Sequence, residues 1–264
     1  MGTLEKKFQI STELNKEVLG TKRILLMGGD GSINYLLNQV EDLKDVSIFY
    51  IPYGTANDFA KSLKLQPVEP TVDLIEQVLN NAPQVEIPVL RCNDKRFINV
   101  ATGGPPAEVT ESGSDFLKKA TGKFSYYVSA IEKAISPDII KLNFKVDENE
   151  NWSEVISPGF SVSQGMYAGG GVKLTESMTP NFGEKFNFLT LKASELAKGA
   201  GELIKLQKLN YVKEENTDDL ISVLTTKLEM KSDKEIPLKL DGEDYSSDHL
   251  VFEKLKAKVN FYIY

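Results

Sequence analysis

Three glycines and a carboxylate form the first candidate site, in the sequence Gly28-Gly29-Asp30-Gly31-Ser32. A short aliphatic run, 23–27, precedes it, and residues 32–40 carry apolar side chains at helical spacing, so we predict strand, turn and helix, with Ser32 as the helix cap. Glycines let a ligand approach bare backbone, and a helix N-terminus favours an anion such as phosphate. A carboxylate beside phosphates is typical of a site that binds a metal ion, or of a site where the carboxylate holds a hydrogen-bond donor in position. A tight turn without a ligand has the same pattern.

The second candidate site is the sequence Tyr53-Gly54-Thr55-Ala56-Asn57-Asp58, again between a predicted strand, 46–51, and a predicted helix, 56–63. Thr55 and Asp58 have the spacing of a capping box. Two successive strand–turn–helix units predict neighbouring parallel strands with both helix N-termini at one sheet edge, where open α/β sheets bind ligands. Asp30, Asn57 and Asp58 would then converge on one ligand. The alternative is that Asp58 only caps its helix.

The third candidate site is Leu240-Asp241-Gly242-Glu243, which closes a predicted strand late in the chain. Two carboxylates that flank a glycine can bind a metal or supply a general base. An ordinary hairpin turn with solvated acids is the other interpretation.

The glycine-rich stretch 165–171 borders a binding cleft or forms a plain loop. The single histidine, His249, is expected at the surface, and Cys92 is expected to be a buried small residue.

The elements that must position these residues change character at about residue 84. Up to that point strands alternate with helices, the third of them predicted over 71–79 after a weakly patterned start with a short strand, 8–11, and a short helix, 12–19. Beyond it most segments alternate apolar and polar residues, which is typical of antiparallel sheets with one solvated face. We predict strands there over 85–90, 96–101, 141–146, 154–163, 185–191, 220–230, 236–240 and 250–264, and helices over 124–135 and 193–209. The predicted fold is therefore an α/β domain over 1–84 followed by a β-rich domain over 85–264.

The composition narrows the functional classes. The 264 residues are 41% hydrophobic and 26% charged, as in ordinary folded soluble proteins, and the net charge of −7 argues against nucleic acid as the main partner. A single cysteine excludes an intramolecular disulfide and a cysteine-based zinc site, and it fits a reducing compartment. No apolar run reaches membrane-spanning length and no signal-peptide pattern opens the chain, so we expect a cytoplasmic protein. Any contact with a membrane would be peripheral; the lysine-bearing segment 193–209 is one candidate for it, and packing on the β-rich domain is the other interpretation of that segment.

Taken together, these motifs resemble the diacylglycerol kinase catalytic domain family, the bacterial soluble lipid kinases in particular. That family has Gly-Gly-Asp-Gly-Thr before a helix and then Pro-x-Gly-Thr-x-Asn-Asp-Phe-Ala, matched here by 28–32 and 52–60. The similarity continues through 96–104, 107–110, 126–127 and 169–171 and ends at Leu240–Glu243. It covers roughly residues 23–264.

The resemblance implies a Rossmann-like, abbreviated α/β nucleotide-binding domain and a β-sandwich-like lipid-substrate domain, with the active site in the cleft between them. The implied reaction is transfer of the ATP γ-phosphate to the hydroxyl of diacylglycerol or a related lipid alcohol at a membrane surface, with Mg²⁺ and in phospholipid metabolism. The implied ATP-binding residues are Gly28, Gly29, Asp30, Gly31, Ser32, Gly54 and Thr55. The implied catalytic residues are Glu243 as the base with Asp241 and Asp30, and the implied substrate residues are Asn57 and Asp58. The resemblance also implies that Asp241, Asp30 and Asp58 position Mg²⁺ and the substrate, and no metal ligand is assigned within 176–187.

The chain departs from the family pattern at several places. No Asn-Pro-x-x-Gly-like turn precedes Gly28, Tyr35 stands where the family usually has glutamate, and Gln164 replaces the usual asparagine before Gly165. Phe182-Gly183 stands where bacterial members have an Asp-Gly pair that holds a structural Mg²⁺. The alternatives are therefore a catalytically impaired relative that binds nucleotide or lipid without turnover, or a sphingoid-base kinase-like enzyme. The motif Gly-Thr-x-Asn-Asp and the late Asp-Gly-Glu favour the lipid branch over an NAD kinase. The acceptor lipid and the oligomeric state are not indicated.

Overall fold

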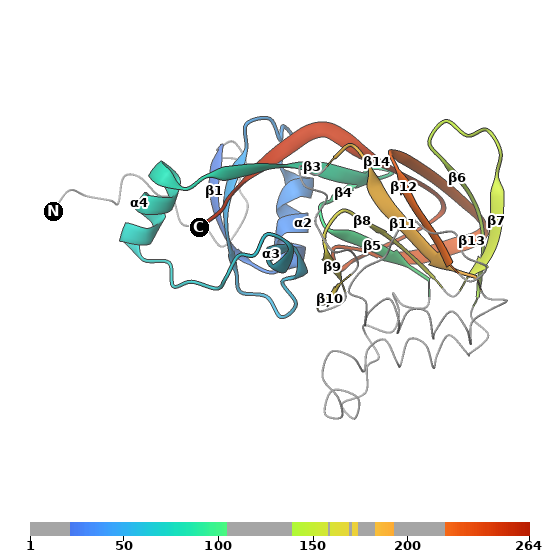
Figure 1. Cartoon of the computed structure of the whole chain (residues 1–264), viewed down its shortest axis with the longest axis horizontal. Helices are drawn as coiled ribbons and strands as arrows, with labels where there is room; N and C mark the ends of the chain where they lie inside the picture. Colours follow the sequence, from blue (N-terminus) through green and yellow to red (C-terminus); the bar gives the residue numbers. More distant parts are fainter. Residues whose placement is uncertain (1–21, 105–138, 158, 169–170, 174–182, 193–219) are drawn as a thin grey trace, which may run out of the picture.

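The computed structural model describes residues 22–104, 139–157, 159–168, 171–173, 183–192 and 220–264. The elements predicted over 8–11, 12–19, 124–135 and 193–209 lie outside these residues. The described part is a mixed sheet with few helices, in which an α/β region and a β-rich region lie side by side and share long strands (Figure 1).

The helices and strands are ordered along the chain as follows: β1 (Arg23–Gly28), α2 (Asp30–Gln39), β2 (Ser47–Pro52), α3 (Asp58–Ser62), α4 (Val72–Asn81), β3 (Gln84–Cys92), β4 (Lys95–Phe97), β5 (Val100–Gly103), β6 (Ile140–Val146), β7 (Ser153–Ser157), β8 (Phe160–Ser163), β9 (Tyr167–Ala168), β10 (Val172–Lys173), β11 (Phe186–Leu191), β12 (Leu220–Thr225), β13 (Lys227–Leu240) and β14 (Glu243–Tyr262).

The strand pairing confirms the two directions expected from the sequence. β1 and β2 are parallel and in a register that sets Gly28 opposite Pro52, so both strands end at the same level. In the β-rich region the pairs, such as β13 with β14 and β5 with β8, are antiparallel. The main sheet has the order β1-β2-β14-β13-β5-β8-β11-β12, with β3, β4, β6 and β7 pairing beside this path.

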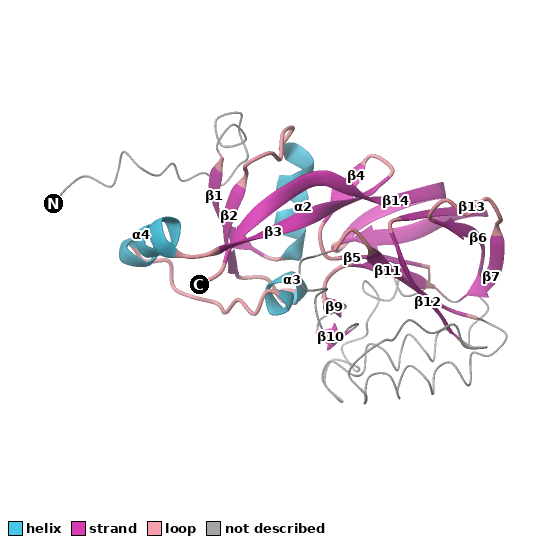
Figure 2. Cartoon of the chain, turned by 45° about the horizontal axis from the view of Figure 1, so that its top comes forward, coloured by secondary structure: helices cyan, strands magenta, loops and turns pink. Residues whose placement is uncertain are grey.

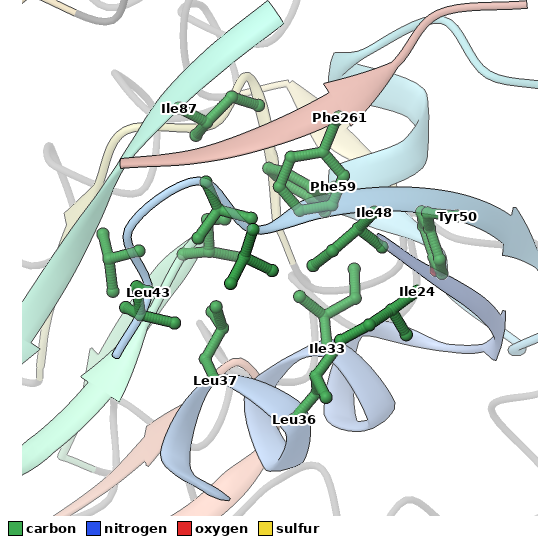
Figure 3. Close-up of a cluster of buried hydrophobic side chains, with 14 of the residues drawn as sticks. Ile24, Ile33, Leu36, Leu37, Leu43, Ile48, Tyr50, Phe59, Ile87 and Phe261 are labelled. Atoms are coloured by element: carbon green, nitrogen blue, oxygen red, sulfur yellow. The ribbon is translucent and has the colours of Figure 1, made fainter. Parts of the chain in front are cut away.

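The alternating side chains of β2 build a core on each face of the parallel strands. Ile48 and Tyr50 pack with α2 and α3, whereas Phe49 and Ile51 pack with α4 on the opposite face. Figure 3 shows the first of these cores, where side chains from helix α2 meet Ile48 and Phe59. Both faces of β2 are therefore buried, as is usual for a parallel strand covered by helices.

The last strand connects the two regions of the molecule. β14 pairs with β13 along its first part and runs parallel to β2 at its end (Figure 2). There Phe261 packs edge-on against Phe59, with ring centroids 5.0 Å apart, and Tyr262 joins the core beneath α4. The end of β14 thus packs in the α/β core, although it lies far beyond residue 84 in the sequence. We therefore propose that the α/β domain consists of the chain up to about residue 84 together with the end of β14.

Two predicted helix caps are wrong. Helix α2 begins at Asp30 with Gly29 as its N-cap, so Ser32 lies inside the first turn instead of capping it. Helix α3 begins at Asp58 with Asn57 as its N-cap, so Thr55 does not form a capping box. The first cap fails because the helix begins within the glycine turn itself, before Ser32. The second fails because the carboxylate of Asp30 accepts the hydrogen bonds that a local cap would accept.

The cap of helix α4 is local and gives a simple stability test. Thr71 accepts a hydrogen bond from the N–H of Leu74 at 3.2 Å, so Thr71→Ala is expected to lower the free energy of unfolding by about 1 kcal/mol. Thr71→Ser keeps the accepting oxygen and serves as the control in urea denaturation. An equal loss in both variants would show that the threonine methyl, and not the cap, is responsible.

Candidate functional site

The two glycine turns lie against each other at the ends of β1 and β2. The N–H of Tyr53 donates to the carbonyl of Gly28 at 2.8 Å. A Cβ atom built on Gly54 would lie 2.5 Å from Gly29 Cα and 2.6 Å from Asn57 Oδ1, closer than any side chain tolerates. Glycine at position 54 is therefore required for the two turns to meet.

Asp30 joins the two turns through its side chain. Its Oδ2 and Oδ1 accept hydrogen bonds from the N–H groups of Asp58, at 2.9 Å, and Phe59, at 3.1 Å, which are the first two donors of helix α3. Asp30 thus does for α3 what an N-cap side chain normally does, from 28 residues away. Burial raises the pKa of Asp30, and the two N–H donors oppose this effect without cancelling it.

Asn57 and Asp58 shape the second turn from within. Asn57 adopts a left-handed backbone conformation, with φ of 50°, and its side-chain amide closes on the backbone of Gly54. Asp58 is 4% exposed, and its Oδ1 contacts the Nζ of Lys61 at 2.8 Å. Thr55 lies exposed at the tip of the same turn. The assignment of Asn57 and Asp58 to substrate contact stays a prediction; their described contacts hold the turn.

The Asp241-Gly242-Glu243 turn joins β13 to β14, with positive φ angles at both Asp241 and Gly242. The carboxylate of Asp241 is buried and accepts three backbone hydrogen bonds, from Ile98 at 2.7 Å and from Asn99 and Val100 at 2.9 Å. Burial raises the pKa of Asp241 to about 7 against these three donors, and the nearby charge of Asp30 adds to the increase. Asp241 thus anchors the turn to the segment that leads into β5.

Glu243 lies where the late turn meets the first glycine turn. A Cβ atom built on Gly31 would lie 2.9 Å from Glu243 Oε1, so this carboxylate is held against the first turn of helix α2. The structure therefore brings together Glu243, the glycine turn and, through Asp30, the second turn. The roles of these residues in catalysis remain predictions.

Other residues singled out by type lie elsewhere. His249 is exposed and its Nε2 contacts Glu229 at 2.8 Å on the surface of the β-rich region, as expected. Cys92 is buried, which confirms the expectation of a buried small residue, and burial raises the pKa of its thiol. Within the described residues no group of three His, Cys, Asp or Glu side chains is arranged to hold a metal by itself.

Several buried polar residues at the site carried no functional interpretation. Ser62 accepts from the N–H of Met166 at 2.9 Å, and the side chain of Asn99 donates to the carbonyl of Tyr167 at 3.0 Å, so α3 and the residue before β5 hold the first part of the glycine-rich stretch. Helix α2 carries the buried Asn34 and the half-buried Asn38. No signal in the sequence identifies these residues, because their partners lie far away along the chain.

Comparisons with known proteins found one matching family model and several similar chains. Residues 5–90 match the model of the diacylglycerol kinase catalytic domain. The diacylglycerol kinase of Bacillus subtilis is 28% identical over 248 residues, which cover 89% of this chain and 79% of that protein. A probable lipid kinase of Alcanivorax borkumensis, YegS-like by name, is 29% identical over 249 residues, covering 92% and 79% of the two chains.

Solved structures share the fold. A candidate diacylglycerol kinase from Bacillus anthracis superimposes with a TM-score of 0.72 at 21% identity, over 94% of this chain and 81% of that chain. An NAD kinase from Archaeoglobus fulgidus in complex with ATP superimposes with a TM-score of 0.53 at 15% identity, over 96% and 82%. Among the described residues, no helix has the length and apolar character needed to cross a membrane.

Proposed function

We propose that this chain, whose residues 5–90 belong to the diacylglycerol kinase catalytic domain family, transfers the γ-phosphate of ATP to the hydroxyl of diacylglycerol or a related lipid alcohol. The observation that carries the proposal is the contact of Glu243 with the first turn of helix α2. It places a carboxylate, the type of group needed to accept a proton from an alcohol, beside the backbone best suited to bind phosphate.

The glycine turns provide the nucleotide site in this proposal. The N-terminus of α2 offers N–H groups and the positive end of the helix dipole to the phosphates, while Gly28, Gly29 and Gly31 allow them to approach. Gly54 and Thr55 complete the site from the second turn. The exposed side chain of Thr55 is free of a capping role and is available to the nucleotide.

Phosphoryl transfer depends mainly on positioning and charge stabilisation, with little covalent chemistry for the protein to perform. Glu243 would accept the proton of the lipid hydroxyl as its oxygen attacks the γ-phosphorus. Asp30 and Asp241 act differently: their carboxylates bind backbone N–H groups, so each holds one turn in place around the reacting atoms.

The residues at the first turn of α2 fit Mg²⁺. In kinase sites this ion is held by one or two carboxylates together with phosphate oxygens, so a three-carboxylate cluster is unnecessary. Asp30, the first residue of α2, is a carboxylate next to the proposed phosphate position and is the candidate to hold the ion, while Glu243 keeps the role of the base. The ion would neutralise negative charge on the transferring phosphate.

The proposed substrate is a membrane lipid, so we propose a cytoplasmic enzyme that works peripherally at a membrane surface. The match of residues 5–90 to the diacylglycerol kinase model and the names of the similar chains support a lipid hydroxyl as acceptor over a nucleotide acceptor.

The proposal is tested by incubating the protein with radiolabelled ATP and a lipid extract in detergent micelles. We expect a labelled phospholipid whose identity names the substrate; diacylglycerol and a sphingoid base are run as separate acceptors. If no lipid is labelled but ATP raises the melting temperature, the chain is a binding relative without turnover. If neither occurs, the kinase proposal fails.

Removal of the metal gives a second result in the same assay. Excess EDTA is expected to abolish labelling, and added Mg²⁺ to restore it, because the phosphates and the carboxylates of the site would otherwise repel each other. EDTA saturated with Mg²⁺ beforehand is the control. Full activity in EDTA would overturn the metal assignment while leaving the kinase proposal intact.

A further inference from the structure

Helix α2 lies on the side of the α/β region that faces the β-rich region, beside β4 (Figures 1 and 2). One of its faces carries Gly31, Asn34 and Asn38, spaced at i, i+3 and i+7. Gly31 meets Glu243, as described above. The two asparagines continue the same face toward the helix C-terminus.

Asn34 is 6% exposed and contacts the Asp241-Gly242-Glu243 turn at its start. Its Nδ2 donates to the carbonyl of Leu240 at 3.2 Å, the residue immediately before the turn. The same group donates to the carbonyl of Arg96 at 3.1 Å in β4. A buried amide that donates to two backbone carbonyls makes a specific link between them. If the amide were removed, each carbonyl would lose this hydrogen bond inside the protein, which costs free energy.

Asn38 and Arg96 fasten the rest of the helix without contacting the turn. Asn38 exchanges two hydrogen bonds with the backbone of Arg96, accepting from its N–H at 2.9 Å and donating to its carbonyl at 2.8 Å. The guanidinium of Arg96 donates to carbonyls at the C-terminal end of α2, those of Leu37, Val40 and Glu41. Cationic donors at this end of a helix also interact favourably with its dipole.

We propose that Asn34 is a positioning residue for phosphoryl transfer: by holding Leu240, it fixes the turn that carries Glu243 against the first turn of helix α2. This inference rests on the proposed function. The nucleotide would bind at one end of the helix and Glu243 projects from the turn that Asn34 contacts, so this side chain links the helix directly to that turn, which Asp241 anchors from the other side. Neither the family match nor the motifs assign this role to Asn34.

Positioning predicts a particular kinetic effect. Loss of the Asn34 donor should loosen the turn while leaving the glycine turns in place, because Asp30 and Gly54 hold those independently. Since small displacements of a catalytic group are costly, kcat is expected to fall about 10- to 100-fold in Asn34→Ala. The KM for ATP and the increase in melting temperature caused by ATP should stay close to those of the unsubstituted protein.

Asn38→Ala is the matched control. It removes an amide of the same size from the same helix face and breaks two hydrogen bonds to β4 and one from Asn38 Nδ2 to Asn34 Oδ1, but it leaves the Asn34 Nδ2 group that donates to Leu240. Both variants should lose thermal stability, and only Asn34→Ala should lose kcat. If Asn34→Ala does not fold, Asn34→Leu takes its place, because it keeps a side chain of similar size and removes the donor without adding a buried charge.

The experiment measures kcat, the KM for ATP and the melting temperature of the full chain and the two variants, with the lipid identified in the assay above. A low kcat at unchanged KM in the Asn34 variant alone supports the inference. Equal kcat losses in both variants, or a normal kcat in the Asn34 variant, would overturn it. If the unsubstituted protein labels no lipid, the proposed function itself fails and takes the inference with it.

Discussion

Replacing Glu243 with glutamine is expected to reduce the rate of lipid phosphorylation by about 10²- to 10⁴-fold, the usual contribution of a general base. Glutamine keeps the shape of the side chain but cannot accept the hydroxyl proton. Glu243 lies exposed at the end of its turn, so the substitution should leave the free energy of unfolding almost unchanged. ATP should still raise the melting temperature, because the glycine turns are untouched.

The neighbouring carboxylate gives a matched control. Asp244 follows Glu243 in the chain, but its side chain is 73% exposed and its Oδ1 contacts the Nζ of Lys239 at 2.6 Å, on the opposite side of the strand from Gly31. Asp244→Asn should therefore retain full activity, since exposed ion pairs contribute little. Equal losses in both variants would mean that negative charge near the site, and not a base at Glu243, matters. A fully active Glu243→Gln would remove Glu243 from the mechanism.

The α/β region could be predicted from the sequence because its signals are local. An aliphatic run that ends at a glycine turn before a segment of helical periodicity leaves few alternatives, and two such units in succession fix parallel neighbours. The register that sets Gly28 opposite Pro52 then follows from turns of the same kind. The strands of the β-rich region were found by their alternation, but their ends were less certain. The prediction over 96–101 joined β4 and β5, which the structure separates at Ile98 and Asn99, where the backbone N–H groups bind Asp241.

The candidate site was predictable only as separate motifs. The sequence shows that Asp30, Asp241 and Glu243 are carboxylates beside glycines and that Asp58 follows a glycine turn, but it does not show what their oxygens bind. Asp30 caps a helix 28 residues away, a contact that no local capping pattern could reveal. Asn34 could not be recognised either, because its partner Leu240 is 206 residues away in the sequence. Long-range polar contacts of this kind depend on the folded sheet, which brings β13 back beside helix α2.

We expect Asp241 to contribute more to the free energy of unfolding than any other residue of the site. Its carboxylate lies buried beneath the turn and accepts three backbone N–H groups, which Asp241→Ala would leave without their acceptor. Each unsatisfied buried donor costs about 1–3 kcal/mol, so we expect a loss of about 3–5 kcal/mol, at the upper end for single substitutions. Asp241→Asn retains one carbonyl oxygen but turns an amide toward N–H donors, and should lose somewhat less. Urea denaturation measures both.

The pH dependence of this loss reports the ionisation of Asp241. Because its pKa is raised to about 7 in the folded protein from 3.8, the folded state binds an extra proton between pH 4 and pH 7. The contribution of Asp241 to stability is therefore complete below pH 4 and decreases, by at most about 1.4 kcal/mol per pH unit, as the pH rises to 7. The difference in unfolding free energy between the unsubstituted protein and Asp241→Asn isolates this effect from other titrating groups. That difference in unfolding free energy should be larger at pH 4.5 than at pH 7.5. If the difference increases with pH instead, the three N–H donors outweigh the effect of burial and keep Asp241 ionised. In that case a permanent negative charge would lie beneath the turn that carries Glu243, and it would add to the charge of Asp30 at the proposed phosphate site.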